Sequence, residues 1–245
     1  MTPPRLYLLD VEGTIAPVSL VTEQLFPYAR KHLADFLTEH FDNAAVQTDL
    51  LLLAVESKTE TEKGAPRIPD SAGTAYLQSP DFQVRALVYL NWLMESDRKS
   101  TALKSLQGKI WKAGFESGEL KGTLFPDVPP ALARWQSHAQ VAIYSSGSTA
   151  AQKLLFRHSI YGDLTPRISA YYDTRTGPKN HPASYLAIAS ATGVLPAEVL
   201  FLSDVTRELD PARAAGLQTR LVVREGNAPI DNPNGHATIQ SFDSL

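Results

Sequence analysis

Two carboxylates stand one residue apart near the start of the chain, directly after a short apolar run. The run Leu6–Leu9 leads into Asp10 and Glu12, which are followed by Gly13 and Thr14. An apolar strand that ends in this way delivers both carboxylates to the carboxyl end of a sheet, where open α/β proteins bind their ligands. Two acids held so close repel each other unless a cation or a shared proton relieves them. The motif therefore suits Mg²⁺ together with a carboxylate that attacks an electrophile.

The two residues after Glu12 extend this chemistry. Gly13 allows the chain to turn sharply, and Thr14 offers a hydroxyl and a backbone N–H to an anion. Taken alone, the same five residues also fit a strand followed by a solvated acidic turn. The rest of the chain must decide between these two interpretations.

Polar residues also follow two later apolar runs. The run 141–144 leads into Ser145 and Ser146, and the run 199–202 leads, after one serine, into Asp204. A hydroxyl-rich junction between a strand and a helix can bind phosphate, and a carboxylate at the same sheet edge is a ligand that Mg²⁺ prefers. Each of these side chains could instead cap the helix that follows.

Three further polar residues lie close to these junctions in the sequence. Lys179 stands in a loop before Pro182, where its charge could neutralise the carboxylates and a phosphate, although most loop lysines are simply solvated. Glu208 could hold a metal-bound water, and a solvated helix face fits it equally well. His181 is expected to begin a helix rather than to act as a general base.

The elements that must position these residues alternate along the second half of the chain. Nearly continuous apolar strands that alternate with helices indicate a parallel sheet covered on both faces, in an α/β fold. We predict strands over 5–10, 141–144, 167–172, 199–202 and 219–223, and helices over 128–138, 149–156, 182–192 and 207–215. The sequence after 226 is predicted to be loop-like until 237–242.

The stretch between residues 17 and 124 has a different pattern. Its apolar residues recur at helical spacing, with no strand pattern. We predict helices over 20–41, 46–54, 82–94 and 101–114, and a long exposed loop over 57–74. The predicted domains are therefore an α/β core of 1–16 plus 125–245, and a helical domain of 17–124 inserted after the first strand.

Composition narrows the class of protein. The chain has 245 residues, with 23 basic against 26 acidic residues and a formal net charge of -3, which argues against a nucleic-acid footprint or a polybasic membrane surface. It contains no cysteine, which excludes disulfides and thiolate sites. The first strand begins within five residues of Met1, and no apolar run approaches the roughly 20 residues that span a bilayer. We expect a cytoplasmic protein without a signal peptide, and a monomer.

Taken in chain order, the strand-end motifs resemble those of the haloacid-dehalogenase superfamily of phosphohydrolases. The resemblance implies a Rossmann-like parallel sheet core and makes the inserted helical domain a cap. It implies one Mg²⁺ per chain, which also takes the backbone carbonyl of the acid/base residue as a ligand. The roles implied are Asp10 as nucleophile and metal ligand, Glu12 as acid/base and metal ligand, Ser145 or Ser146 as phosphate ligand, Lys179 as catalytic and phosphate-binding cation, and Asp204 as the principal metal aspartate.

Glu12 departs from the superfamily pattern, which has aspartate at this position. Glu12, the runs 107–115 and 151–156 and the junction 124–128 resemble one branch, the enolase-phosphatases or acireductone synthases of methionine salvage. That branch implies enolisation of 2,3-diketo-5-methylthiopentyl-1-phosphate and then dephosphorylation, through an aspartyl phosphate, to the acireductone 1,2-dihydroxy-3-keto-5-methylthiopentene. The partner is accordingly expected to be a small phosphorylated metabolite.

Other functions remain open at this point. A capped phosphomonoesterase could act on another small metabolite, and a binding protein could keep the fold without activity, although it need not retain all four charged positions. A metal-free dehalogenase would make little use of Asp10, Glu12 and Asp204 together. Nothing in the spacing identifies the base that abstracts the carbon-bound proton. Trp92, Trp111 and Phe115 could line a closed cap or belong to its core.

Overall fold

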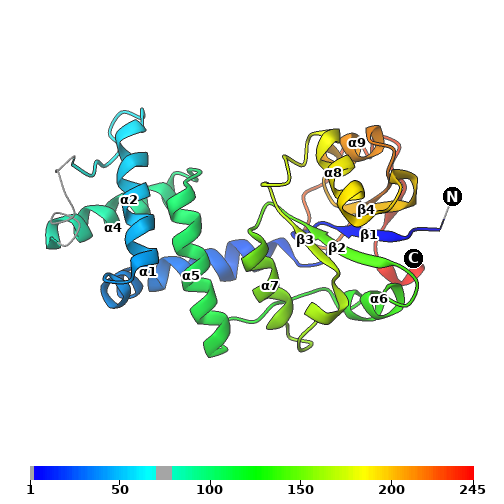
Figure 1. Ribbon diagram of the computed structural model, residues 1–245, viewed down its shortest axis with the longest axis horizontal. Coiled ribbons are helices and arrows are strands. Elements are labelled where there is room, and N and C mark those ends of the chain that lie inside the picture. The colour runs from blue at the N-terminus through cyan, green and yellow to red at the C-terminus, as the bar shows by residue number, and fades with distance from the viewer. Residues whose placement is uncertain (1–2, 70–78) are drawn as a thin grey trace. The chain divides into compact units, whose positions relative to one another are not determined.

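The computed structural model describes residues 3–69 and 79–245, and the chain divides into two compact units (Figure 1). One unit comprises Met1–Gln24 and Phe115–Leu245, and the other comprises Leu25–Gly114. The first unit contains the sheet and the second is helical. The action of the helical unit as a cap stays a prediction.

The first unit is built around a six-stranded sheet. The strands are β1 (Leu6–Leu9), β2 (Gln140–Tyr144), β3 (Ala170–Tyr172), β4 (Val199–Ser203), β5 (Gln218–Val222) and β6 (Thr238–Ile239). Their order is β3-β2-β1-β4-β5-β6, and every neighbouring pair is parallel. The predicted α/β class with a parallel sheet is therefore confirmed.

Helices cover both faces of this sheet. They are α6 (Val128–Trp135), α7 (Thr149–Arg157), α8 (Pro182–Thr192) and α9 (Thr206–Ala214). Figure 1 shows α8 and α9 on one face, with α6 and α7 on the other. Successive side chains of β1 alternate between the faces: Leu6 and Leu8 pack in the core with α8 and α9, whereas the Tyr7 ring stacks at 4.1 Å on Trp135 of α6. Burial on both faces explains why β1 is apolar throughout.

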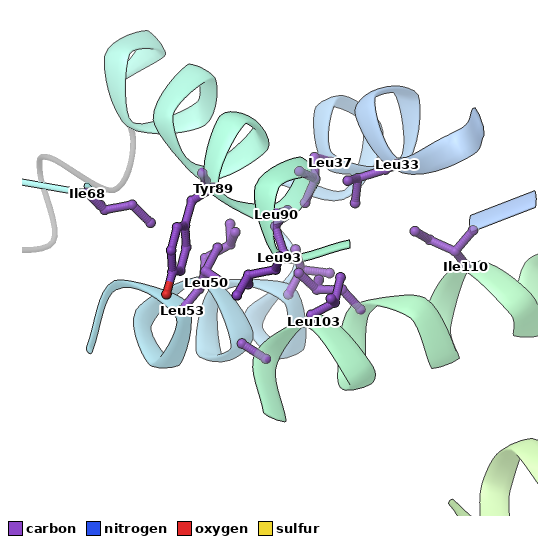
Figure 2. Close-up of a cluster of buried hydrophobic side chains, with 14 of the residues drawn as sticks. Leu33, Leu37, Leu50, Leu53, Ile68, Tyr89, Leu90, Leu93, Leu103 and Ile110 are labelled. Atoms are coloured by element: carbon purple, nitrogen blue, oxygen red, sulfur yellow. The ribbon is translucent and has the colours of Figure 1, made fainter. Parts of the chain in front are cut away.

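The helical unit has its own hydrophobic core, shown in Figure 2. Its helices are α1 (Phe26–His40), α2 (Ala44–Thr59), α4 (Pro80–Glu95) and α5 (Thr101–Ser117). The side chains of Asn43 and Ser79 accept hydrogen bonds from the first turns of α2 and α4, and so set where these helices begin. Leu50, Leu90 and Leu103, from three of the helices, are nearly inaccessible in the shared core. Within 17–69 and 79–125, the part of this range that the structure describes, no residue belongs to a strand of the sheet, as the sequence predicts.

The structure corrects several details of the predicted elements. Residues Leu20–Leu25 form a π-helical segment before α1, where one continuous helix was expected. The loop predicted over 57–74 is not simply exposed, because α2 continues to Thr59 and the buried Ser57 hydroxyl accepts a hydrogen bond from the N–H of Ile68 at 2.9 Å. Residues 70–74 of that prediction lie outside the described residues.

The stretch 237–242, where the predicted loop after 226 ends, contains β6, whose type the sequence did not identify. β6 has only two residues and pairs beside β5, which makes it too short for a recognisable alternation. The strand predicted over 167–172 begins later, because residues Thr165–Arg167 form a 3₁₀ turn before β3. Within the ranges that the structure describes, no helix is both long enough and apolar enough to cross a membrane.

The position of Leu8 gives a test of this core. Leu8 is fully buried in β1, between β2 and β4, so Leu8→Ala should lower the free energy of unfolding by about 2–5 kcal/mol. Leu186 on α8 is 46% exposed, and Leu186→Ala should change it by less than about 0.5 kcal/mol. Urea unfolding followed by circular dichroism measures both. Equal losses in the two variants would contradict this description of the core.

Candidate active site

Asp10 lies just beyond the last residue of β1, at the carboxyl end of the sheet. Its backbone N–H still donates to the carbonyl of Leu202 at 3.0 Å, so its position is fixed by the neighbouring strand. Its side chain is buried, with only 4% of the residue exposed. One carboxylate oxygen, Oδ1, lies 2.5 Å from Nζ of Lys179, and the other accepts a hydrogen bond from the Thr14 hydroxyl at 3.3 Å.

A tight turn follows Asp10. The carbonyl of Val11 accepts hydrogen bonds from the N–H groups of Thr14, Ile15 and Ala16 at 3.2, 3.0 and 2.9 Å. Gly13 has φ of 71°, and a Cβ added to it would lie 2.2 Å from Oδ2 of Asp204. Glycine is therefore required here both for its backbone conformation and for the close approach of Asp204.

The backbone and hydroxyl of Thr14 have partners within the protein. Its N–H is used by Val11, and its hydroxyl donates to Asp10 and accepts a hydrogen bond from the N–H of Asp204 at 3.1 Å. The residue is fully buried. The Thr14 hydroxyl is thus donated to the Asp10 carboxylate and its N–H to a backbone carbonyl, so any contact of Thr14 with a bound anion stays a prediction. Thr14 instead joins the turn after β1 to the loop after β4.

Lys179 lies between two carboxylates. Its Nζ is 2.5 Å from Asp10 and 2.5 Å from Oε2 of Glu208, and only 9% of the residue is exposed. Burial alone would lower the pKa of this lysine, but the attraction of Asp10 and Glu208 outweighs burial and holds the pKa above its ordinary value. The Tyr185 hydroxyl donates to the backbone carbonyls of Lys179 and Glu208 at 2.7 and 2.9 Å. These contacts exclude the interpretation of Lys179 as a solvated lysine in a loop.

Glu208 is also part of this buried group. It lies in the first turn of α9, and its side chain is 20% exposed. Besides Lys179, it accepts a hydrogen bond from the Ser203 hydroxyl at 3.0 Å. Burial, and then the nearby charge of Asp10, raise the pKa of the Glu208 carboxyl. The interpretation that Glu208 lies on a solvated helix face is therefore wrong. Sequence reasoning missed Ser203 and Tyr185, which carry no motif signal.

Asp204 has the features of a metal ligand. Its Oδ1 is buried and has no hydrogen-bond partner among the residues that the structure describes. Burial, and then Asp10, raise the pKa of the Asp204 carboxyl to about 7, and the charge of Lys179 only partly offsets them. Across residues 3–69 and 79–245, no three Asp, Glu, His or Cys side chains gather as a ligand set. Two carboxylates with a backbone carbonyl and waters would still suit Mg²⁺, which usually keeps several of its waters.

Glu12 and Ser145 lie together at the neighbouring strand ends. The Ser145 hydroxyl is 3.5 Å from Oε2 of Glu12, and it accepts a hydrogen bond from the N–H of Gly147 at 3.1 Å. Burial, and then Asp10, raise the pKa of the Glu12 carboxyl. Ser145 is buried, whereas Ser146 is exposed at the same junction. His181 directly precedes α8, as predicted.

The aromatic residues singled out from the sequence are all at least partly buried. In the helical unit, the indole N–H of Trp111 donates to the carbonyl of Leu25 at 2.7 Å, and Trp92 packs under the guanidinium of Arg98 at 5.6 Å. Both pack against the hydrophobic core of that unit. Phe115 is 3% exposed, beside His158 in the sheet unit. All three therefore serve packing, and any contact with a substrate stays a prediction.

The sheet and its strand-end carboxylates define the class of haloacid dehalogenase-like hydrolases, whose family model matches residues 4–216. The UTR4 protein of Saccharomyces cerevisiae has a similar structure, with a TM-score of 0.77 and 32% identity over 99% of this chain and 100% of that chain. The enolase-phosphatase E1 of Synechococcus elongatus is 52% identical over 97% of this chain and 96% of the relative. The enolase-phosphatase E1 of Pseudomonas fluorescens is 43% identical over 98% of this chain and 96% of the relative. The chain therefore belongs to the enolase-phosphatase E1 family.

The buried Lys179 predicts how stability depends on pH. Lys179→Met leaves Asp10 and Glu208 without their counter-charge, which should lower the free energy of unfolding by about 3–5 kcal/mol at neutral pH, measured by urea unfolding in EDTA. The pKa of Glu208 is already raised in the folded protein. Glu208 therefore binds a proton more readily in the folded variant than in the unfolded chain. The free energy of unfolding of the variant accordingly falls as the pH rises above about 4.3, the pKa of a glutamate in the unfolded chain.

The loss of stability in the Lys179→Met variant should accordingly become smaller as the pH is lowered toward about 4.3, because the Glu208 carboxyl becomes protonated in the folded variant. Lys121→Met is the control, because Lys121 is exposed in the same unit. It should show little loss at any pH. A deficit in Lys179→Met that does not change with pH would argue against the buried ion group.

Proposed function

We propose that this chain is a Mg²⁺-dependent enolase-phosphatase. It converts 2,3-diketo-5-methylthiopentyl-1-phosphate to the acireductone 1,2-dihydroxy-3-keto-5-methylthiopentene, by enolisation and then dephosphorylation. The observation that carries the proposal is a buried carboxylate, Asp10, held 2.5 Å from a buried lysine at the carboxyl end of the sheet. The high identity to proteins named enolase-phosphatase E1 supports this choice of substrate.

Asp10 is the proposed nucleophile. A carboxylate oxygen of Asp10 attacks phosphorus, the bond from phosphorus to the substrate's ester oxygen breaks, and an aspartyl phosphate remains. Lys179 holds the Asp10 carboxylate in place and offsets the charge of the transferring group. Glu208, on the other side of the lysine, keeps Nζ in position through its own ion pair.

Glu12 is the proposed general acid and base. Its raised pKa supports a carboxyl that still carries a proton when the substrate binds, so it can protonate the leaving oxygen. The resulting carboxylate then takes a proton from the water that attacks the aspartyl phosphate. Ser145, 3.5 Å from Glu12, orients this carboxyl. Ser145 and Ser146, together with Lys179, are the proposed ligands of the phosphate.

The proposed Mg²⁺ site consists of the carboxylates of Asp10 and Asp204 and the backbone carbonyl of Glu12. The buried, unpartnered Oδ1 of Asp204 supports it, because an acceptor without a donor fits a cation. When bound, one Mg²⁺ per chain would offset negative charge on the phosphoryl oxygens. The donor set contains only oxygen, which suits Mg²⁺ rather than a softer metal.

The helical insertion, residues 17–124, is the proposed cap, and it excludes water while the enol forms. A group other than Glu12 is proposed to abstract the carbon-bound proton, because Glu12 must keep its proton for the leaving oxygen. The proposal extends to a cytoplasmic monomer that acts on a free small metabolite, which the nearly balanced charge and the absence of cysteine support.

Turnover of the diketo phosphate tests the proposed function directly. The protein should release phosphate and the acireductone in the presence of Mg²⁺ and lose activity in excess EDTA. Asp10→Asn removes the nucleophile with little change of shape, so turnover should fall by at least about 10³-fold. Beryllium fluoride, an analogue of the transferred phosphoryl group, should bind next to Asp10 in the wild-type protein.

The control for this experiment is Asp35→Asn, since Asp35 is exposed on α1 and the variant should keep full activity. Undiminished turnover in Asp10→Asn would contradict the nucleophile assignment. Hydrolysis of other small phosphate esters without any turnover of the diketo compound would favour a capped phosphomonoesterase instead.

Glu12→Gln separates the two half-reactions. This variant lacks the proton donor for the leaving oxygen, so dephosphorylation should slow by about 10²-fold or more. If another group serves enolisation, the phosphorylated enol should accumulate, and deuterium from solvent should still enter the substrate. Ultraviolet absorbance and mass spectrometry measure these two effects. Loss of deuterium uptake in step with phosphate release would mean that Glu12 serves both steps.

A further inference from the structure

A loop far along the chain holds the turn that follows Asp10. Nδ2 of Asn227 donates to the carbonyl of Gly13 at 2.9 Å, and Nε of Arg224 donates to the carbonyl of Thr14 at 3.2 Å. Two consecutive peptide groups of the turn are thereby fixed by side chains from the loop directly after β5. All four residues belong to the sheet unit.

The local sequence explains why both side chains reach the same turn. Residues 224–227 form a tight turn, in which the N–H of Asn227 donates to the carbonyl of Arg224 at 3.2 Å. Its third residue, Gly226, has φ of 86°, the conformation that a type II turn requires and that glycine adopts readily. The turn therefore brings Arg224 and Asn227 back toward Gly13 and Thr14.

Arg224 makes several contacts that stabilise the fold. It forms an ion pair with Asp127 at 2.9 Å, donates to the carbonyl of Gln240 at 2.9 Å, and lies between the rings of Phe125 and Phe242, each 4.6 Å away. These contacts account for its burial without reference to the reaction. Replacing Arg224 would disturb the fold, so it gives no clean test of the site.

Asn227 differs from Arg224, because half of its amide has no partner. Its Oδ1 is buried and accepts no hydrogen bond from the residues that the structure describes. The amide cannot be turned over, because only its nitrogen can donate to the Gly13 carbonyl, and so its oxygen must face the other way. A Cβ added to Gly13 would lie 3.1 Å from this oxygen and 2.2 Å from Oδ2 of Asp204.

The oxygen of Asn227 and the carboxylate of Asp204 therefore face the same side of Gly13. Oδ2 is the Asp204 oxygen nearest to Gly13, and Oδ1, the other oxygen of this carboxylate, lacks a partner among the described residues, as Oδ1 of Asn227 does. Buried acceptors in folded proteins are normally satisfied, and here a donor must come from outside the protein. A cation that keeps part of its hydration shell supplies such donors.

We propose that Asn227 is a positioning residue of the active site with two roles. Its amide nitrogen holds the Gly13 peptide group, and thus the turn between Glu12 and Thr14. Its amide oxygen accepts a hydrogen bond from a water molecule of the cation bound at Asp204. The inference rests on the Mg²⁺ site of the proposed function, and it adds a residue that lies outside the four motifs considered from the sequence.

Binding of Mn²⁺ to metal-free protein, measured by electron paramagnetic resonance, tests the inference without substrate. Asn227→Ala removes both roles and should weaken Mn²⁺ binding about 10- to 100-fold, the range typical of outer contacts to a metal site. Asn232→Ala is the matched control. Asn232 lies exposed in the same loop, where its side chain accepts a hydrogen bond from the N–H of Asn234, and its variant should bind Mn²⁺ as the wild type does.

Asn227→Asp separates the two roles and keeps the size of the side chain. It retains an acceptor beside Asp204, so Mn²⁺ should bind at least as tightly as in the wild type. It loses the donor to Gly13, so kcat should fall about 10-fold or more with little change in KM. If Asn227→Asp weakens Mn²⁺ as much as Asn227→Ala does, the amide oxygen is not the acceptor.

Unchanged Mn²⁺ affinity in Asn227→Ala, with only a lower melting temperature, would make Asn227 a purely structural residue and overturn the inference. Failure of this inference is distinguishable from failure of the proposed function. A wild type that binds Mn²⁺ but does not turn over the diketo phosphate refutes the function and leaves the Asn227 comparison intact. A wild type that binds no Mn²⁺ refutes the inference as well.

Discussion

The ion group of Asp10, Lys179 and Glu208 is the constraint on which the rest of the site depends. Burial removes most of the solvation of these three charged side chains. The ion pairs compensate for this cost, because each carboxylate lies 2.5 Å from the lysine. The group still carries one excess negative charge, which helps to raise the pKa values of Glu12 and Asp204 around it. A site with this imbalance favours a cation and a proton, and both are what phosphoryl transfer to a carboxylate requires.

The sheet alone does not bring these groups together. β1 and β4 are neighbours, so Asp10 and Asp204 emerge at the same edge, but the distance between their loops is set by the Thr14 hydroxyl, which joins one to the other. Gly13 allows Asp204 to come close, and Asn227 holds the Gly13 carbonyl from outside. The carboxylates are thus arranged by a layer of uncharged groups, none of which would take part in the chemistry.

The sequence predicts the ends of the strands well and the use of each polar group less well. Continuous apolar runs locate β1, β2 and β4, and parallel strands must end at one edge, so Asp10, Ser145 and Asp204 could be expected near each other. The partners of Thr14 could not be predicted, because a hydroxyl in a motif gives no sign that its partners lie within the protein. Glu208 and Asn227 depend on contacts between distant segments, which spacing along the chain does not encode. β6 is too short to produce a pattern.

The position of β1 has a consequence for how the chain folds. It is the first strand to be synthesised, yet it lies in the middle of the sheet, and its partners β2 and β4 begin only at Gln140 and Val199. Leu6–Leu9 must remain without both partners until the chain has been made as far as β4, and an exposed apolar strand edge is prone to aggregate. Long loops must also close before the ion pair of Asp10 with Lys179 forms, which slows folding. During synthesis, Asp10 therefore leaves the ribosome well before the segments that carry Lys179 and Glu208, so its charged surroundings form only after those later segments have been made.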